Sequence, residues 1–258
     1  TGHFNGYIPV AKEEIERIEV LLGPAAAMYG PDAVGGLINI VTKTFAGTVK
    51  KGITGNVELG YGSNNHIIGE TGVTGAGDRF SWSLARMINN SDGERIASRT
   101  VSDDVTLEPF RTFFNMHTVG GSFAYKLKDN LRLKFRTSYD FRDFNARYFY
   151  SDLAVDKSTE VISQSFNTLQ LDQITKNRRS DIQLSYKYST DDFTFSPDFP
   201  STNSHVMQFA NFITNHLWDL NETWMLKAGV QIDHRQIESN DRGNHEDWHA
   251  GVYAMALF

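Results

Sequence analysis

The sequence of 258 residues contains no cysteine, few prolines and no long hydrophobic run. Without cysteine it forms neither a disulfide framework nor a thiolate metal site. Its most apolar stretch, residues 20–41, is interrupted by glycines, prolines and an aspartate, so it falls short of the roughly 18 apolar residues of a membrane-spanning helix. The net charge of -6 lacks the basic field that is usual for nucleic-acid-binding proteins. These absences exclude a helical membrane protein and argue against a nucleic-acid partner.

Aromatic residues are plentiful, with 18 Phe and 10 Tyr, and many lie in segments where polar and apolar residues alternate. In residues 131–141, leucines and aromatic residues occupy one face, whereas charged and hydroxyl side chains occupy the other. The same alternation returns at residues 79–85, 119–127, 180–188 and 223–233. Such segments of about 10 residues match the length that a tilted strand needs to cross a membrane.

Short turns alternate with longer polar connections along this region. Turns at 76–78, 128–130, 176–179 and 219–222 separate long connections at 89–115, 148–163, 191–203 and 239–246, and the connection at 63–65 is a short exception. Outer-membrane barrels have short turns on one side and long loops on the other. The expected fold is an all-β transmembrane barrel, of which this chain supplies about ten antiparallel strands, preceded by the end of a small α/β domain.

The first 50 residues follow a different pattern. Residues 11–23 predict either a short helix or a short strand, because isoleucines at helical spacing lie within a segment that also reads as a strand. Breaks at Gly23-Pro24 and Gly30-Pro31 then separate a run of small residues from a β-branched strand at 38–41. This pattern predicts a compact piece made of short elements.

The segment from Ile15 to Lys43 resembles the end of the plug domain of TonB-dependent outer-membrane receptors. The family pattern contains Ile-Glu-Arg-Ile-Glu-Val, Gly-Pro, Tyr-Gly, Gly-Gly, Ile-Asn-Ile and Thr-Lys, and all of these occur here in that order. One position departs from it, because Leu22 stands where the family commonly has arginine. The plug-motif residues carried over from the family are Gly23, Pro24, Tyr29, Gly30, Gly35, Gly36 and Asn39.

The resemblance implies two domains: the C-terminal part of a plug in residues 1–50, and the N-terminal part of a β-barrel in residues 51–258. In the family, charged residues of the motif hold the plug against the barrel, a role that carries over to Glu16, Arg17 and Glu19. We also expect lumen-facing cations to pair with acids of this segment; the cations are Arg132, Lys134 and Arg136, and the acids are Glu13, Glu14, Glu16 and Glu19. Because the chain begins at Thr1 without a signal sequence, we expect it to be a fragment that lacks the TonB contact box.

The function that the resemblance implies is active import across the Gram-negative outer membrane. A scarce ligand, most often a ferric siderophore in this family, binds at the outer face and enters with energy from the TonB complex. The expected partners are the TonB protein, outer-membrane lipid and the ligand, with no cofactor and no metal site. A passive porin-like or adhesin barrel and a soluble β-sandwich binding module remain as alternatives.

The longest predicted loop mixes basic and aromatic side chains, which can hold an anionic aromatic iron chelate. The candidate residues are Arg95, Arg99, Arg111, Phe110, Phe113 and Phe114. We prefer the simpler interpretation that this loop folds over the barrel mouth. The glycines at 30 and 35 lack the lysine that a phosphate-binding loop needs, and no catalytic triad or carboxylate pair can be assigned from spacing. We therefore do not expect an enzyme.

Overall fold

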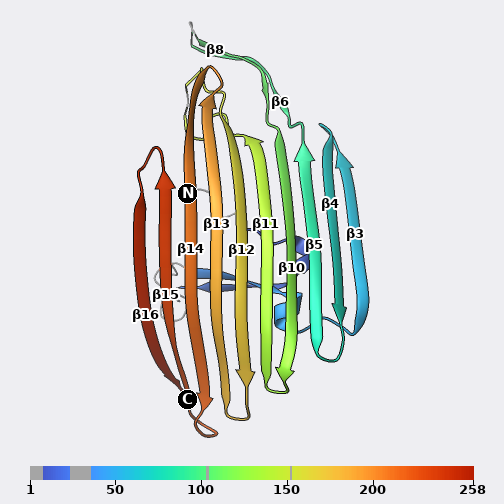
Figure 1. Cartoon of the computed structure of the whole chain (residues 1–258). Helices are drawn as coiled ribbons and strands as arrows, with labels where there is room; N and C mark the ends of the chain where they lie inside the picture. The colour runs from blue at the N-terminus through green and yellow to red at the C-terminus, as the bar shows by residue number, and fades with distance from the viewer. Residues whose placement is uncertain (1–7, 24–35, 103–104, 152) are drawn as a thin grey trace.

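A computed structural model describes residues 8–23, 36–102, 105–151 and 153–258 (Figure 1). Most of the chain forms one antiparallel sheet of ten strands, in which strands that follow one another along the chain are neighbours. We call this sheet the wall. Its strands are β3 (Gly52–Gly62), β4 (His66–Ala76), β5 (Phe80–Ser91), β10 (Phe114–Lys128), β11 (Leu131–Asn145), β12 (Thr159–Ile174), β13 (Arg178–Ser196), β14 (Phe199–Asp219), β15 (Met225–Ser239) and β16 (His245–Leu257).

The predicted alternation of short turns and long connections is confirmed at most positions. The short turns after β4, β10, β12 and β14 lie at one end of the wall, and the longest connections, 92–113 and 146–158, lie at the other, together with the short connections 63–65 and 197–198 (Figure 1). The prediction of a long loop at 191–203 was wrong, because β13 and β14 run through it and only residues 197 and 198 connect them. The connection after β5 contains two small two-stranded sheets: β6 (Arg95–Ile96) pairs with β9 (Phe110–Arg111), and β7 (Arg99–Ser102) pairs with β8 (Val105–Leu107).

The N-terminal residues form a separate small structure that crosses one face of the wall (Figure 1). A single 3-10 turn, η1 (Lys12–Glu14), leads into strand β1 (Ile15–Leu22), which pairs antiparallel with β2 (Gly36–Thr42). Residues 15–22 are therefore a strand rather than a helix. A one-turn helix that the sequence did not predict, α2 (Lys43–Ala46), follows β2. We call the described residues from 8 to 48 the N-terminal unit.

The two faces of the wall have opposite chemistry. On β11, Lys134, Arg136 and Asp140 are buried on the face beside the N-terminal unit, whereas Phe135 and Tyr139 are exposed on the opposite face. We call these faces inner and outer. A soluble sandwich buries its apolar face, so this arrangement contradicts the sandwich alternative and fits a wall whose outer face meets lipid. Among the described residues, no helix is long and apolar enough to span a membrane.

Candidate functional site

The tightest contact between the N-terminal unit and the wall is an ion pair between Glu14 and Arg136. Arg136 Nε donates to Glu14 Oε2 at 3.0 Å, and Arg136 Nη2 donates to Glu14 Oε1 at 3.1 Å. Both side chains are almost completely removed from solvent, with exposed fractions of 0% and 6%. Two parallel hydrogen bonds fix the orientation of both groups, so this pair sets the position of η1 on the wall.

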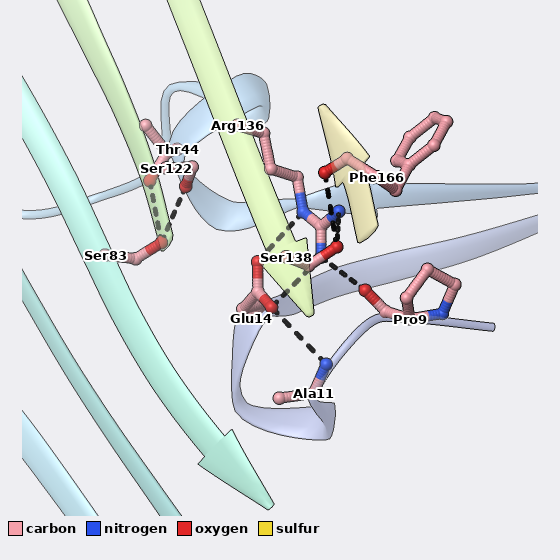
Figure 2. A network of polar contacts seen from close by, with 9 residues as sticks. All are labelled: Pro9, Ala11, Glu14, Thr44, Ser83, Ser122, Arg136, Ser138 and Phe166. Carbon is pink, nitrogen blue, oxygen red and sulfur yellow. Dashed lines mark hydrogen bonds and ion pairs between the residues drawn. The ribbon is translucent and has the colours of Figure 1, made fainter. Parts of the chain in front are cut away.

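Further hydrogen bonds complete the surroundings of this pair (Figure 2). Arg136 donates to the carbonyl of Pro9 at 2.8 Å and to Ser138 Oγ at 3.1 Å, while the amide of Ala11 donates to Glu14 Oε1 at 3.3 Å. The guanidinium is thereby satisfied from both the wall and the N-terminal unit. A buried charge of this kind is stable only when its partners are present.

Two inward-facing glycines of the wall make room for the acids of η1. A Cβ atom placed on Gly120 would overlap the carboxylate of Glu14, and one placed on Gly72 would lie 2.7 Å from Cβ of Glu13. Real Cβ atoms essentially never come this close to another atom. The backbone of η1 can approach the wall because these two positions lack side chains.

The helix α2 forms a second contact with the wall. Thr44 Oγ1 donates to Ser83 Oγ at 3.2 Å, and Ser83 lies 2.7 Å from Ser122 Oγ (Figure 2). Nearby, Lys134 Nζ donates to the carbonyl of Phe45 at 2.8 Å and pairs with Asp172 of the wall. The N-terminal unit is therefore held at both of its short helical turns.

A cluster of three acids lies at the edge of η1, but its positive partner is already present. Carboxylate oxygens of Glu13, Glu58 and Glu70 lie within 4.8 Å of one another, the one such group found in the described residues. Lys12 Nζ lies 3.1 Å from both Glu58 and Glu70, and these hydrogen bonds raise the pKa of Lys12 above its usual value. The ammonium group occupies the place a cation would take, so we assign no metal here.

The residues predicted to anchor the plug contact one another and nearby residues of the N-terminal unit. Arg17 Nε donates to Glu19 at 2.7 Å, and Glu19 also accepts from Asn39 at 2.8 Å. Glu16 accepts from Thr48 Oγ1 at 2.9 Å. The anchoring role assigned to Glu16, Arg17 and Glu19 stays a prediction. The predicted pairing of lumen cations with acids of the N-terminal segment is found for Arg136 and Glu14.

The plug-motif residues are only partly described. Pro24, Tyr29, Gly30 and Gly35 lie outside the described residues. Gly36 has a φ of 152°, and a Cβ atom there would lie 2.7 Å from the carbonyl oxygen of Leu21, so the pairing of β1 and β2 requires glycine at this position. Gly23 has a φ of 90°, which also favours glycine, and Asn39 binds Glu19 across the two strands.

Four inner-face residues form a row that alternates aromatic and cationic side chains. Phe166, Lys187, Phe209 and Arg235 are directly opposite one another on β12, β13, β14 and β15. We call them the lumen row. The Arg235 guanidinium lies 5.6 Å from the centre of the Phe209 ring, a cation–π contact. Phe166 and Lys187 also line a cavity of about 700 Å³ between the wall and β2.

Lys187 is the member of the lumen row that is available to a ligand. Its neighbours in the row are two phenylalanines, and it has no ion pair among the residues that the structure describes. The row lies one step toward the long-loop end from the Glu14–Arg136 pair, since Ser138 is opposite Phe166 whereas Arg136 is opposite Thr168. A lysine without an ion pair that lies opposite two phenylalanines, beside a cavity, is suited to an anion with aromatic faces.

The six candidate residues of the loop after β5 do not form one cluster in the structure. Arg95 and Arg111 are opposite each other on β6 and β9, and Arg111 donates to the carbonyl of Gly93 at 3.1 Å. Arg99 lies on β7. Phe113 lies just before β10, and its carbonyl accepts from the amide of Asn145 at 3.0 Å.

The two remaining loop residues contact rings. Phe114 packs edge-on against His66 at 5.7 Å. Phe110 meets Tyr148 at the same distance, and the guanidinium of Arg147 lies 4.7 Å from the Phe110 ring. Arg147 was not predicted, because its sequence neighbourhood gives no sign that it meets the earlier loop.

The loop at 146–158 is held in shape by one buried acid. Asp156 accepts from the amide of Tyr148 at 3.1 Å and from the amide of Ser158 at 2.8 Å, and its own carbonyl accepts from Arg147. The rings of Phe149 and Tyr150 remain half exposed on this loop. The long-loop end of the wall therefore presents exposed aromatic rings, beside a buried arginine, Arg147, that lies over the rings of Phe110 and Tyr148.

The chain is similar in sequence to proteins named as iron and siderophore receptors. No family model matches the chain. It is 34% identical over 123 residues, or 46% of its length, to "Ferric enterobactin receptor PirA" of Pseudomonas aeruginosa, and covers 15% of that protein. Over 34 residues, 13% of the chain, it is 65% identical to "Probable TonB-dependent siderophore receptor PirA" of Acinetobacter baumannii, covering 4% of it.

The fold agrees with a solved structure over almost the whole chain. The crystal structure of the ferric enterobactin receptor from Pseudomonas aeruginosa superposes on 94% of this chain with a TM-score of 0.73 and 15% sequence identity. The chain covers 42% of that structure. At this identity the superposition supports the fold, and the chain is much shorter than the proteins it matches.

Proposed function

We propose that this chain is part of a TonB-dependent outer-membrane receptor and takes part in binding a ferric siderophore and importing it with energy from the TonB complex. Residues 1–50 would be the end of the plug domain, and residues 51–258 the first part of the barrel. The contact of η1 and α2 with the inner face favours this division. It also disfavours a passive channel, whose lumen would be open.

The lumen row is the observation that supports an anionic ligand. Iron chelates with aromatic arms carry negative charge and flat rings. The row offers two cations, with Lys187 opposite Phe166 and Phe209 and with Arg235 on the other side of Phe209. Each charge-assisted hydrogen bond contributes about 1.5–3 kcal/mol. We propose Lys187 as a ligand contact, and we keep Arg95, Arg99, Arg111, Phe110, Phe113 and Phe114 as candidates for first capture at the mouth.

Binding to the full-length receptor tests this proposal. The compounds to be tested are a ferric catecholate, a ferric hydroxamate, haem, cobalamin and an oligosaccharide. Binding of each is followed by the change in intrinsic protein fluorescence. We expect an anionic aromatic chelate to bind most tightly, and Lys187→Gln to weaken it by about tenfold or more, since about 1.4 kcal/mol corresponds to a tenfold change. The control is Lys128→Gln, which removes an exposed lysine at the short-turn end.

Growth on the chelate as sole iron source tests the energy coupling. We expect rescue by the wild-type receptor in cells with TonB and no rescue in cells without it. Binding of cobalamin or a glycan with no binding of any iron chelate would overturn the choice of ligand. Equal affinities of the wild type and Lys187→Gln for the chelate would show that the lumen row is not part of the binding site.

A further inference from the structure

Two carboxyl groups, those of Glu160 and Asp191, lie next to each other on the inner face of the wall at its long-loop end. Each residue is buried, with an exposed fraction of 3%. Asp191 on β13 is opposite Ile162 on β12, so Glu160, two residues before Ile162, is its diagonal neighbour on the same face. The two side chains are hydrogen-bonded to each other. A carboxylate can only accept a hydrogen bond, so this bond requires a proton on one of the two groups.

Aromatic rings flank and cover the Glu160 carboxyl group. On the wall, Phe144 of β11 and Phe193 of β13 are directly opposite Glu160. The loop at 146–158 adds two more rings. The ring of Phe149 lies 6.1 Å from that of Phe144, and the ring of Tyr150 lies 5.2 Å from that of Phe193. The loop therefore packs over the acid pair and keeps it out of water.

One hydrogen bond connects this loop to the acid pair. The hydroxyl group of Tyr150 donates to Glu160 Oε2 at 3.1 Å. Tyr148, two residues earlier, has a φ of 65°, a left-handed conformation that a residue other than glycine adopts only at a cost in free energy. The closed shape of the loop therefore depends on contacts that offset this cost, and the Tyr150 hydrogen bond is one of them.

Three further titratable or charged side chains face the pair from neighbouring elements. Each of them has a hydrogen-bond partner other than Glu160, and Glu160 forms no ion pair with any residue that the structure describes. The three are Arg142 of β11, which pairs with Asp140 at 2.8 Å, Arg147 of the loop, which is bound to the carbonyl of Asp156, and His205 of β14, which is hydrogen-bonded to Ser239 at 2.8 Å.

The acid pair lies beyond the membrane-spanning part of the wall. β12 has 16 residues and Glu160 is its second, so Glu160 lies about 45 Å along the strand from the short-turn end. With a strand tilt of about 40°, this is about 35 Å along the membrane normal, whereas the apolar band is about 25 Å tall. Burial, together with the negative charge of Asp191, raises the pKa of Glu160 to about 7. Glu160 therefore carries a proton in acid and loses it close to neutral pH.

We propose that Glu160, Asp191 and Tyr150 form a proton-dependent latch that holds the loop at 146–158 against the wall. In the closed form, protonated Glu160 donates to Asp191 and accepts from Tyr150. When Glu160 releases its proton to the solvent, two negative charges lie together beneath the rings, and the loop moves away because water can then reach them. The latch contains no residue of the lumen row, so it does not depend on the proposed ligand.

The direction of the pH effect follows from the pKa of Glu160 in the two forms. When the loop opens, this pKa returns toward its ordinary value of 4.5, so the open form binds fewer protons than the closed form. The opening equilibrium therefore rises with pH by up to about tenfold per unit between these two pKa values. It levels off above the higher value, because Glu160 is then ionised in both forms. The loop is expected to be closed in acid and to open more often near neutral pH.

Hydrogen exchange of the full-length receptor without ligand tests the latch. The protection of amides 146–150 is measured from about pH 5 to about pH 8 and corrected for the intrinsic pH dependence of exchange. We expect this protection to fall by about tenfold or more between about pH 5 and about pH 7 and to change little above that. Peptides from the other long connection, residues 92–113, are expected to show no such fall.

Three variants separate the latch from general effects of charge. Glu160→Gln imitates the protonated acid, because its amide can donate to Asp191 and accept from Tyr150, and it is expected to keep the loop equally protected across this pH range. Asp191→Asn removes the neighbouring charge and is expected to move the midpoint about one pH unit or more toward acid. It also serves as the test variant if Glu160→Gln does not assemble. Glu94→Gln, which changes an exposed acid at the same end of the wall, is the control and is expected to behave as the wild type.

Three outcomes would overturn the proposal. Constant protection of the wild-type loop across this pH range would show that the loop does not respond to the acid pair. An unchanged fall in Glu160→Gln would assign the titration to another group. An equal fall in the peptides of residues 92–113 would indicate a general loosening of the long-loop end. Because no chelate is present, none of these results depends on whether the receptor binds a ferric siderophore.

Discussion

Glu14 illustrates how one side chain can fix a contact between two parts of the chain. Its carboxylate is fully buried and receives both hydrogen bonds of the Arg136 fork. Taking two charges out of water is costly, and the cost is offset only while both partners are present. The pair therefore fixes the position of η1 on the wall, because any other placement of η1 would leave Arg136 buried without its anion.

Replacing Glu14 with glutamine is expected to weaken the attachment of the N-terminal unit. Removal of one partner of a buried pair typically costs about 3–5 kcal/mol. We expect Glu14→Gln in the full-length receptor to increase cleavage of the N-terminal unit by added protease and to lower the urea concentration at which that unit is released. Glu222→Gln is the matched control, since Glu222 is exposed in the turn between β14 and β15 and such changes cost within about 0.5 kcal/mol. Equal effects of the two variants would contradict the role given to Glu14.

At the scale of elements, the wall is shaped to receive η1. The inward positions of β4 and β10 nearest to η1 are Gly72 and Gly120, so the acids of the turn lie close to the wall backbone. Glycine weakens a strand, because it has no side chain to pack and loses more backbone freedom on folding. Its presence at these two places is explained by the close approach of Glu13 and Glu14.

Gly120→Ala is expected to reproduce the effect of Glu14→Gln. The added methyl group would overlap the Glu14 carboxylate and push it away from Arg136. We expect the same rise in protease cleavage, with the barrel still heat-modifiable on gels. Gly251→Ala on β16 is the matched control, because a Cβ atom there has no neighbour within 4 Å. Wild-type resistance of Gly120→Ala to protease would refute this account of the contact.

The ten strands and an opposite-charge contact between the N-terminal acids and the inner face could be predicted from the sequence, but the particular pair that forms could not. Membrane strands show a period of two, which is visible in the sequence wherever one face meets lipid. Beyond the lipid this constraint ends, so the polar residues 191–203 suggested a loop although β13 and β14 continue there. Glu14 lies in a 3-10 turn before β1, where strand alternation does not set its direction. Nothing local distinguishes it from Glu16.

At the scale of the whole molecule, the wall has two open edges. β3 and β16 each pair with one neighbour, so their outer edges leave backbone groups of the ten-stranded sheet unpaired. The exposed apolar side chains on β3 are Ile53, Val57, Leu59 and Tyr61. In a membrane, unpaired backbone groups are satisfied only by closure with further strands. Such an edge is a template for pairing with other chains.

The 258-residue chain on its own is therefore expected to associate and not to bind ligand. Refolded into detergent, it should elute as oligomers by size-exclusion chromatography with light scattering, because β3 and β16 of different copies can pair. The full-length receptor, handled in the same way, should be monomeric and bind its chelate. The lumen row is present in both proteins, so loss of binding only in the isolated chain would show that the row needs the closed barrel. A monomeric isolated chain with the affinity of the full-length receptor would contradict this expectation.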